Sequence, residues 1–466
     1  MFHYYIHFFF ICFGVLASCC KKSSFYQDTM KRADGNRAEL DGVLYHYREV
    51  DPNPEKLSAA KYLIKNLAAH YSYMGNEIQD YYDYAALILK DTSLKPEQQR
   101  DSLLEKTDLM YSSLADKTIY DAQIIKAKYL IDNIDKSYNA WKNYPWANHL
   151  SFDDYLEWLL PYKGVELQEL DSWRDTLYSH FGEKMNSQFK NDVEYETTIG
   201  MAEKIRNNIF QNIGRYGLYT RSGLPLLNSY LLPRQTFGDI QDYALLAHLS
   251  FRASGIPSVI DETPVGARDI AASRWFVILS DRGQELASEW DVSTLIGGSF
   301  FPYERGPKVY RRTYEINSER KKYYNNAKWI YPFDLFHKDV TSQYYLDSDV
   351  YLNLKKCTRS KLKDKYVYIA SAIRINQESL AVIAGLPDYP GWKIVDFGVI
   401  KGKKALFKNM GREVLYLALG YDGNSLIPLD NPFILHKDGS LEFILYDTVK
   451  STSLDMWKNN DNTIRP

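Results

Sequence analysis

The sequence predicts a multidomain α+β protein, with a helical N-terminal region, a mixed middle region and an all-β C-terminal region. Three observations support this. The chain has 466 residues, more than one hydrophobic core usually organises. Apolar residues recur at helical spacing up to about residue 190. From about residue 346 onward, strand-like runs alternate with glycine-containing turns.

The composition indicates a folded protein without a strong global field. There are 57 Lys+Arg against 59 Asp+Glu, and 45% of residues are hydrophobic. Wholesale disorder is therefore excluded, and the near-neutral charge favours neither nucleic acid nor an anionic membrane surface as a partner. The 39 tyrosines raise the aromatic content to 15%. They could form a sugar-binding platform, but packing at domain boundaries and surfaces explains them more simply.

The first segment predicts export and lipidation. Residues 1–18 contain no Lys, Arg, Asp or Glu, and the apolar stretch 8–17 has the length of a signal-peptide core. It ends in Leu16-Ala17-Ser18-Cys19, which resembles a bacterial lipobox with Cys19 as the acylated residue. The stretch lacks the usual basic start, and Cys20 leaves the cleavage site open by one residue. We therefore expect a lipoprotein of a Gram-negative cell envelope, in the outer membrane by preference, with the periplasmic or surface face open.

The remaining cysteines and the histidines predict no metal or cofactor. After removal of Cys12 and acylation of Cys19, only Cys20 and Cys357 remain, so the folded body has no disulfide framework. There is no CxxC pair, and the histidines are scattered. Cys357 reads as a small apolar filler in the β region.

The predicted domains follow these patterns in chain order. Asp51-Pro52-Asn53-Pro54 marks a turn, and helical periodicity follows around residues 57–67, 95–114 and 124–138. Helices over 201–213 and 238–254 precede strands at 258–260, 275–279 and 286–290, which suggests a helix on a small antiparallel sheet. Later strand-like runs suggest a β-sandwich or two small β modules. The expected divisions are residues 1–18 (signal peptide), 19–40 (lipidated tether), 41–190 (helical), 191–345 (α+β) and 346–466 (all-β).

The second helix of the α+β region carries a family resemblance. Gly238-Asp239-Ile240-Gln241-Asp242 opens it, and Arg252-Ala253-Ser254-Gly255-Ile256-Pro257 follows its end. This resembles the core of transglutaminase-like domains, where Gly-x-Cys-x-Asp opens a helix that ends in Arg-Ala-x-Gly-Ile-Pro. Four flanking pieces resemble multidomain lipoprotein members from Bacteroidetes: Leu159-Leu160-Pro161-Tyr162 through Trp173-Arg174, Lys308-Val309-Tyr310-Arg311, Asp339-Val340-Thr341 and Asn431-Pro432-Phe433. The resemblance covers most of the mature chain.

The resemblance implies a catalytic triad, and two of its three positions are changed. The family uses a thiolate at the helix start, a histidine that moves the proton and an acid that orients the ring. Here the cysteine position is Ile240 and the histidine position is Ser273, and neither side chain can do that work. Asp291 matches the acidic position, with Glu289 as its rival on the same strand face.

Other polar side chains around these positions form a candidate pocket: Asp239, Asp242, Arg274, Trp275 and Glu289. The two aspartates also complement the helix dipole, which is the simpler role for them. His248 lies about 12 Å along the helix from Ile240, outside hydrogen-bond reach, so we expect it to be packed. A basic run, which we interpret as a solvated face, comprises Arg305, Lys308, Arg311, Arg312, Arg320, Lys321 and Lys322.

Three functional hypotheses remain. The leading one is an envelope lipoprotein with a catalytically inactive transglutaminase-like domain that binds a glycan, a peptide or a protein partner. The second is a hydrolase (protease, amidase or glycan-acting enzyme) with a rebuilt carboxylate site, which predicts convergent carboxylates in a cleft. The third is a structural scaffold of an envelope complex, which predicts a broad apolar surface instead.

Overall fold

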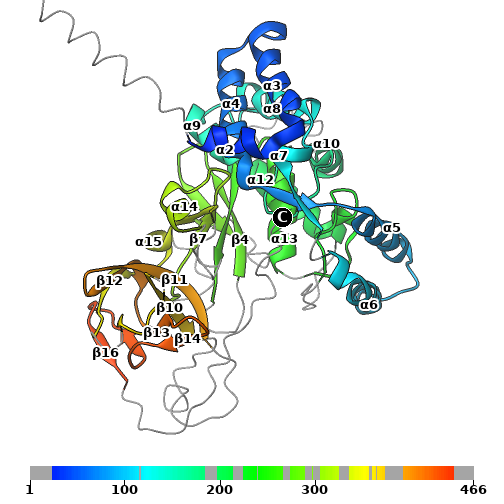
Figure 1. Ribbon diagram of the computed structural model, residues 1–466. Helices are drawn as coiled ribbons and strands as arrows, with labels where there is room; N and C mark the ends of the chain where they lie inside the picture. The colour runs from blue at the N-terminus through cyan, green and yellow to red at the C-terminus, as the bar shows by residue number, and fades with distance from the viewer. Residues whose placement is uncertain are drawn as a thin grey trace, which may run out of the picture.

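The structure is a computed structural model that describes residues 24–114, 117–183, 197–213, 224–238, 240–265, 273–288, 296–297, 305–324, 335–355, 359–363, 365–372 and 392–444. It is an α+β molecule with a helical N-terminal region, a mixed middle region and a curled antiparallel C-terminal sheet (Figure 1). Several residues of the sequence hypotheses lie outside the described residues: Cys12, Cys19, Cys20, Asp239, Glu289, Asp291 and Cys357. None of the described helices is both long and apolar enough to cross a membrane.

The N-terminal region is helical, as predicted. Its helices are α2 (Ser24–Ala33), α3 (Arg37–Tyr45), α4 (Pro54–Asn66), α5 (Asn76–Lys90), α6 (Pro96–Leu114), α7 (Asp121–Ile124), α8 (Ala127–Asn143), α9 (Phe152–Asp154) and α10 (Trp173–Leu177). Two short strands, β1 (Tyr71–Tyr73) and β2 (Thr118–Tyr120), pair antiparallel between them. The predicted turn at residues 51–54 is confirmed: the Asn53 side chain caps α4 by accepting the Glu55 and Lys56 amides, with Pro54 in the first turn.

The folded body begins earlier than the sequence predicted. We expected residues 19–40 to form a tether, but from Ser24 onward the chain forms α2 and the start of α3. Ala33 and Leu40 are buried in the core. Asn36 donates two side-chain hydrogen bonds, at 3.1 and 2.8 Å, to the carbonyls of Ala122 and Ile125. The helix thus packs against the body, because its apolar residues find partners there.

The middle region is a helix-covered antiparallel sheet. Its helices are α12 (Thr198–Ile213), α13 (Ile240–Ala253), α14 (Ser318–Tyr324) and α15 (Thr341–Tyr344). Its strands are β3 (Ser258–Thr263), β4 (Ser273–Leu279), β5 (Glu285–Ser288), β6 (Ile296–Gly297), β7 (Tyr310–Arg312) and β8 (His337–Asp339). They lie in the order β6-β5-β4-β3-β7-β8, with all neighbouring pairs antiparallel. The predicted helix on a small antiparallel sheet is confirmed at this level.

The helical and middle regions share one hydrophobic core. A single cluster of buried side chains runs from Ala33 in α2 to Tyr345 after α15. The tryptophan-rich segment belongs to it: Trp158 and Trp173 are buried, and Trp141 stacks on Tyr155 with ring centres 4.5 Å apart. This segment is therefore packing, as the sequence favoured. The two regions form one body, although the sequence predicted a boundary near residue 190.

The C-terminal strands form one curled half-barrel sheet. They are β9 (Asp347–Asn353), β10 (Tyr366–Ala372), β11 (Trp392–Lys401), β12 (Lys404–Gly411), β13 (Val414–Tyr421), β14 (Leu426–Pro428), β15 (Phe433–Leu435) and β16 (Leu441–Phe443). Their order is β16-β15-β13-β10-β11-β12-β9, with β14 paired to β13. We expected a sandwich-like pair of sheets. The described strands instead join a single ladder, which curls around its own apolar cluster.

A short segment before β7 joins this sheet to the middle region. Lys308 is fully buried, and its ammonium lies 2.5 Å from Asp339 and 3.1 Å from Asp396 of β11. Tyr310 donates a hydrogen bond to the Val395 carbonyl at 2.8 Å. The basic run 305–322 is thus not simply a solvated face, as we had interpreted it, because Lys308, Arg311 and Arg320 are all buried. Acidic partners from other segments explain the difference.

Candidate functional site

Ile240 and Ser273, which the resemblance aligns with a cysteine and a histidine, lie at the same end of the middle region. α13 begins at Ile240 and ends at Ala253. The chain then reverses direction at Gly255 and enters β3, which returns alongside the helix. The 14 helical residues and six strand residues each span roughly 20 Å, so Thr263 returns to the level of Ile240. Thr263 pairs with Ser273, the first residue of β4. The backbone therefore brings the positions of Ile240 and Ser273 to one end of α13, which runs beside β4 in Figure 1.

Asp242 of the candidate pocket is buried in the first turn of α13. Its side chain is 2% exposed and accepts a hydrogen bond from Gln235 at 3.4 Å. Gln235 is itself buried and lies in the segment that leads into the helix. Asp242 therefore contacts the helix entry and complements the dipole, as the simpler of the two sequence interpretations proposed.

Arg274 of the candidate pocket is ion-paired with a carboxylate that the sequence reasoning missed. Its Nε lies 2.6 Å from Glu262 Oε2, and Glu262 also contacts Arg312 at 3.3 Å and His337 Nε2 at 2.5 Å. Burial alone would raise the pKa of Glu262, but the charges of Arg274 and Arg312 and the His337 hydrogen bond hold it well below its usual range. Glu262 was missed because the predicted strand ended at residue 260. Glu262 lies opposite Arg274 across β3 and β4, and this pairing can be predicted only when the register of the two strands is known.

Trp275, another pocket candidate, is fully buried and belongs to a hydrogen-bonded chain. Its indole donates to the Tyr344 hydroxyl at 2.9 Å, and that hydroxyl donates to Asp261 at 2.7 Å. Asp261 holds Arg311 through two bonds of 2.8 Å, and Arg311 also contacts Glu285 at 2.8 Å. Trp275 thus connects β4, α15 and β7, and is not open to a ligand.

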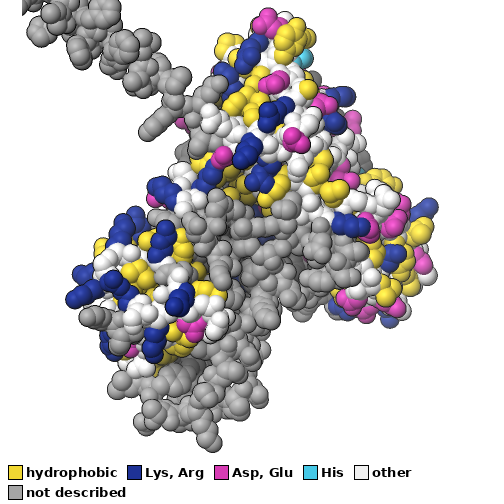
Figure 2. Space-filling model, viewed as in Figure 1, with side chains coloured by type: hydrophobic (Ala, Val, Ile, Leu, Met, Phe, Trp, Pro, Cys, Tyr) yellow, Lys and Arg dark blue, Asp and Glu magenta, His cyan; other side chains and the backbone are white. Residues whose placement is uncertain are grey.

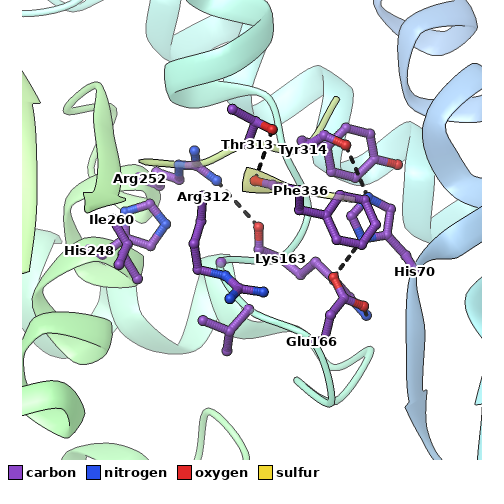
Figure 3. A pocket seen from close by; sticks show the side chains of 12 residues that line it. His70, Lys163, Glu166, His248, Arg252, Ile260, Arg312, Thr313, Tyr314 and Phe336 are labelled. Atoms are coloured by element: carbon purple, nitrogen blue, oxygen red, sulfur yellow. Dashed lines mark hydrogen bonds and ion pairs between the residues drawn. The ribbon is translucent and has the colours of Figure 1, made fainter. Parts of the chain in front are cut away.

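A polar cavity lies beside β3, where the helical region meets β7 (Figure 3). Its volume is about 20 Å³, which is room for about one water molecule. Its charged and aromatic lining comes from separate parts of the chain: His70, Lys163, Glu166, His248, Arg252, Arg312, Tyr314 and Phe336. The sequence reasoning named His248, the two arginines and Tyr314, which is interleaved with the basic run, but it did not bring them together, because this lining forms only in the folded chain.

His70 is a buried member of this cavity. Its ring is stacked between Tyr314 and Phe336, with ring centres 4.4 and 4.2 Å away. Nδ1 lies 2.8 Å from a Glu166 oxygen and Nε2 lies 3.2 Å from the Tyr314 carbonyl. Both partners are acceptors, so this geometry suits an imidazolium that donates from both nitrogens. Stacking between two aromatic faces suits the same charge.

Glu166 and Lys163 complete the charged part of the cavity. Burial opposes the charge of Glu166, but His70 and Lys163 lower the pKa of this carboxyl to about 2. The buried Lys163 ammonium lies 2.5 Å from Asp121, which also accepts hydrogen bonds from Tyr162 and Ser72 at 2.6 Å each. The group forms a buried network with its charges matched, an arrangement that stabilises contacts between segments.

Arg252, the arginine of the family-like motif, binds backbone carbonyls. It donates to Trp158 and Ser258 at 3.0 and 2.9 Å, and to Glu157 at 2.9 Å. Its neighbour Arg174 donates to the carbonyls of Leu159 and Arg252, at 2.7 and 2.8 Å. Burial and the charge of the other arginine lower the pKa of Arg252 to about 9, so it stays charged at neutral pH. The two arginines therefore fasten the loop at residues 157–163 onto the end of α13.

His248 is packed, as predicted. It is 1% exposed, and its Nδ1 lies 3.1 Å from the Ser258 hydroxyl. Burial, with the charges of Arg252 and Arg174, holds the pKa of His248 well below its usual range, so the ring is neutral. Gly164 passes so close that a Cβ there would lie 2.8 Å from the ring. The ring fills the space between α13 and the loop.

Comparison with known proteins gives no family assignment. No protein-family model, no curated protein and no solved structure matches the chain. Within the described ranges, no group of three or more His, Cys, Asp or Glu side chains could hold a metal ion. The site must therefore be interpreted from its own residues.

Proposed function

We propose that this chain is a non-catalytic binding protein of the cell envelope, anchored through Cys19, with a degenerate transglutaminase-like middle region. The proposal rests on the residues that begin two elements: Ile240 begins α13 and Ser273 begins β4, where the resemblance expects a thiol and an imidazole. Isoleucine has no nucleophilic atom, and serine cannot act as a general base near neutral pH, so the two residues do not form a nucleophile–base pair. These residues therefore favour a role in binding a glycan, a peptide or a protein partner over a catalytic role.

The surrounding contacts favour this proposal over a rebuilt hydrolase. A carboxylate-based enzyme needs acids that converge on an open cleft. Among the described candidates, Asp242 is buried against Gln235, and the pairs Arg274–Glu262 and Trp275–Tyr344 are bonded within the sheet. These contacts stabilise the fold around the degenerate positions. The proposed binding surface is then the end of the middle region where α13 and β4 begin.

The test is an assay of the purified chain for amide hydrolysis and for amine incorporation into glutamine-containing peptides. We expect no turnover from the wild type. Turnover that D242A or D291A abolishes would overturn the proposal and favour the hydrolase. The I240C variant supplies a positive control for geometry: a thiol at the start of α13 should alkylate faster at neutral pH than an exposed cysteine, because the helix dipole lowers its pKa.

A further inference from the structure

One end of the C-terminal sheet concentrates positive charge. β9 and β11 finish there, β10 and β12 begin there, and the pairs Asn353–Lys404 and Val399–Tyr366 fix that register. Eight exposed basic side chains lie on these strand ends and their turns, and we call them the basic end: Lys355, Arg359, Lys361, Lys363, Lys365, Lys401, Lys403 and Lys404. Figure 2 shows Lys and Arg side chains gathered over this sheet, at the lower left.

The turn contacts confirm that these residues share one end of the sheet. Leu354 donates its amide to the Lys403 carbonyl at 2.8 Å, and Ile400 donates to Lys365 at 2.9 Å. Arg359 donates to the Gly402 carbonyl. Lys363 donates its amide to Tyr421, the last residue of β13, at 2.8 Å. Segments up to 49 positions apart in the sequence therefore place their basic side chains together.

The described acids near the basic end leave most of this charge uncompensated. Asp430 lies 3.8 Å from Lys355, with both side chains largely exposed, so the pair is weak. Asp422 accepts the backbone amides of Asn424 and Ser425 in its own turn. Glu319 of α14 lies near Lys401 and is itself paired with Lys322. Asp364 also stands between Lys363 and Lys365 in the sequence. Eight basic side chains against Asp364, Asp422 and Asp430 still leave a net positive charge of about five.

The opposite end of the same sheet carries the acids. It is fixed by the pairs Asp347–Gly411 and Val414–Leu435, and its acidic side chains are Asp347, Glu413, Asp438 and Glu442. Arg412 and Lys437 also lie there. The eight residues of β12 span roughly 26 Å, well over the screening length of about 8 Å at physiological salt. The acids therefore do not cancel the charge that an object touching the basic end would meet.

We propose that the basic end lies against a lipid bilayer that carries anionic phospholipid headgroups. Lysines on turns form a diffuse, mobile set of point charges, which suits many headgroups at once. Seven of the eight are lysines and Arg359 is the one arginine, so the basic end offers few of the forked guanidinium donors that bind a phosphate through two hydrogen bonds. Nucleic-acid recognition relies on such arginine contacts, so the lysine-rich composition favours the bilayer.

The inference stands apart from the proposed binding role at α13. It rests on the charges of the C-terminal sheet, and it needs neither the lipid anchor nor the degenerate site. With an anchor at Cys19, it would give the protein a second contact with the membrane. Failure of one proposal therefore leaves the other untouched.

The test is flotation of the full chain with vesicles of phosphatidylcholine alone or with about one third phosphatidylglycerol. The variant K401E/K403E/K404E is compared with K61E/K90E/K95E, which makes the same charge change at exposed lysines of the helical region. We expect wild-type partitioning to rise with phosphatidylglycerol and fall with salt. The partition coefficient onto the phosphatidylglycerol vesicles should fall about a hundredfold or more for the basic-end variant. It should change little for the control variant.

Three outcomes would overturn the proposal: wild-type binding that ignores phosphatidylglycerol, equal losses in both variants, or tighter binding to random duplex DNA than to the anionic vesicles at 0.15 M salt. Thermal unfolding of each variant establishes that it is folded. If K401E/K403E/K404E does not fold, K361E/K363E/K365E replaces it. Lysine acylation read by mass spectrometry adds a position-specific measure, with protection of the basic end expected only with phosphatidylglycerol vesicles.

Discussion

At the residue scale, the cavity around His70 shows how buried charge joins distant segments. His70 precedes β1, Glu166 lies in the loop after the π-helical turn Tyr155–Leu159, and Tyr314 follows β7. The carboxylate binds the imidazole and also accepts the Tyr71 amide at 2.9 Å. Because a buried pair is costly to break from one side, each member depends on the others.

We predict that Glu166→Gln destabilises the protein at neutral pH by about 3 kcal/mol. The folded pKa of Glu166, about 2, lies below its ordinary value of 4.5, so its contribution is fully present above pH 4.5. It is lost as the pH falls from 4.5 toward 2. Urea unfolding at several pH values should therefore show the wild-type advantage shrinking over that window.

Glu105→Gln is the matched control, because Glu105 is exposed on α6 and should change little. A wild-type advantage over Glu166→Gln that is the same at pH 7 and pH 3 would contradict the role of the carboxylate charge. Such a result would place the loss in packing alone.

At the scale of elements, the turn from α13 into β3 depends on a glycine. Gly255 has φ +78°, a conformation that L side chains rarely adopt. A Cβ there would lie 2.6 Å from the Tyr144 ring and 2.9 Å from Ala140 Cβ. The turn therefore requires glycine both for its backbone and for the close approach of α8.

We predict that Gly255→Ala destabilises the protein by about 2 to 4 kcal/mol, from left-handed strain together with the clash on α8. Gly283→Ala is the control, since Gly283 has φ +72° and open space around its Cα. It should cost only about 1 to 2 kcal/mol. Equal losses for the two variants in urea unfolding would show that the contact with Tyr144 and Ala140 relaxes freely.

Many of the helices and strands could be predicted from the sequence. The bounds of α13 and the strands after it follow from apolar periodicity and from Gly255-Ile256-Pro257. The contacts of Glu262, Asp261 and His70 could not be predicted, because cross-strand register and packing between distant segments are not local properties. The same reason explains the tether error: Ala33 of α2 packs into a core built by distant segments, and Asn36, in the turn after α2, bonds to the Ala122 carbonyl of α7.

At the scale of the whole molecule, two bodies meet through the segment before β7. The first holds the shared core of the helical and middle regions, and the second is the curled sheet around its own cluster. Val265, which follows β3, packs into the cluster of the sheet. Lys308 binds the carboxylates of Asp339 and Asp396 at this junction, one from each body. The sequence predicted a β region after the middle region, but it did not predict the contacts that join the two.

We predict that Lys308→Met destabilises the junction by about 3 to 5 kcal/mol, because it leaves two largely buried carboxylates without their cation. Hydrogen exchange followed by mass spectrometry should show faster exchange in β11 and β12, with α13 little changed. Lys338→Met is the control, since Lys338 is exposed on β8 beside the same junction. Faster exchange spread evenly over both bodies would contradict a local fastening role.

The separation of charge along the curled sheet has a consequence for orientation. A body with positive charge at one end and negative charge at the other experiences a torque near any charged interface, in addition to attraction or repulsion. The sheet would therefore turn its positive end toward an anionic interface before contact. Since Lys308 ties the sheet to the middle region, this turning would also set the direction in which the start of α13 faces.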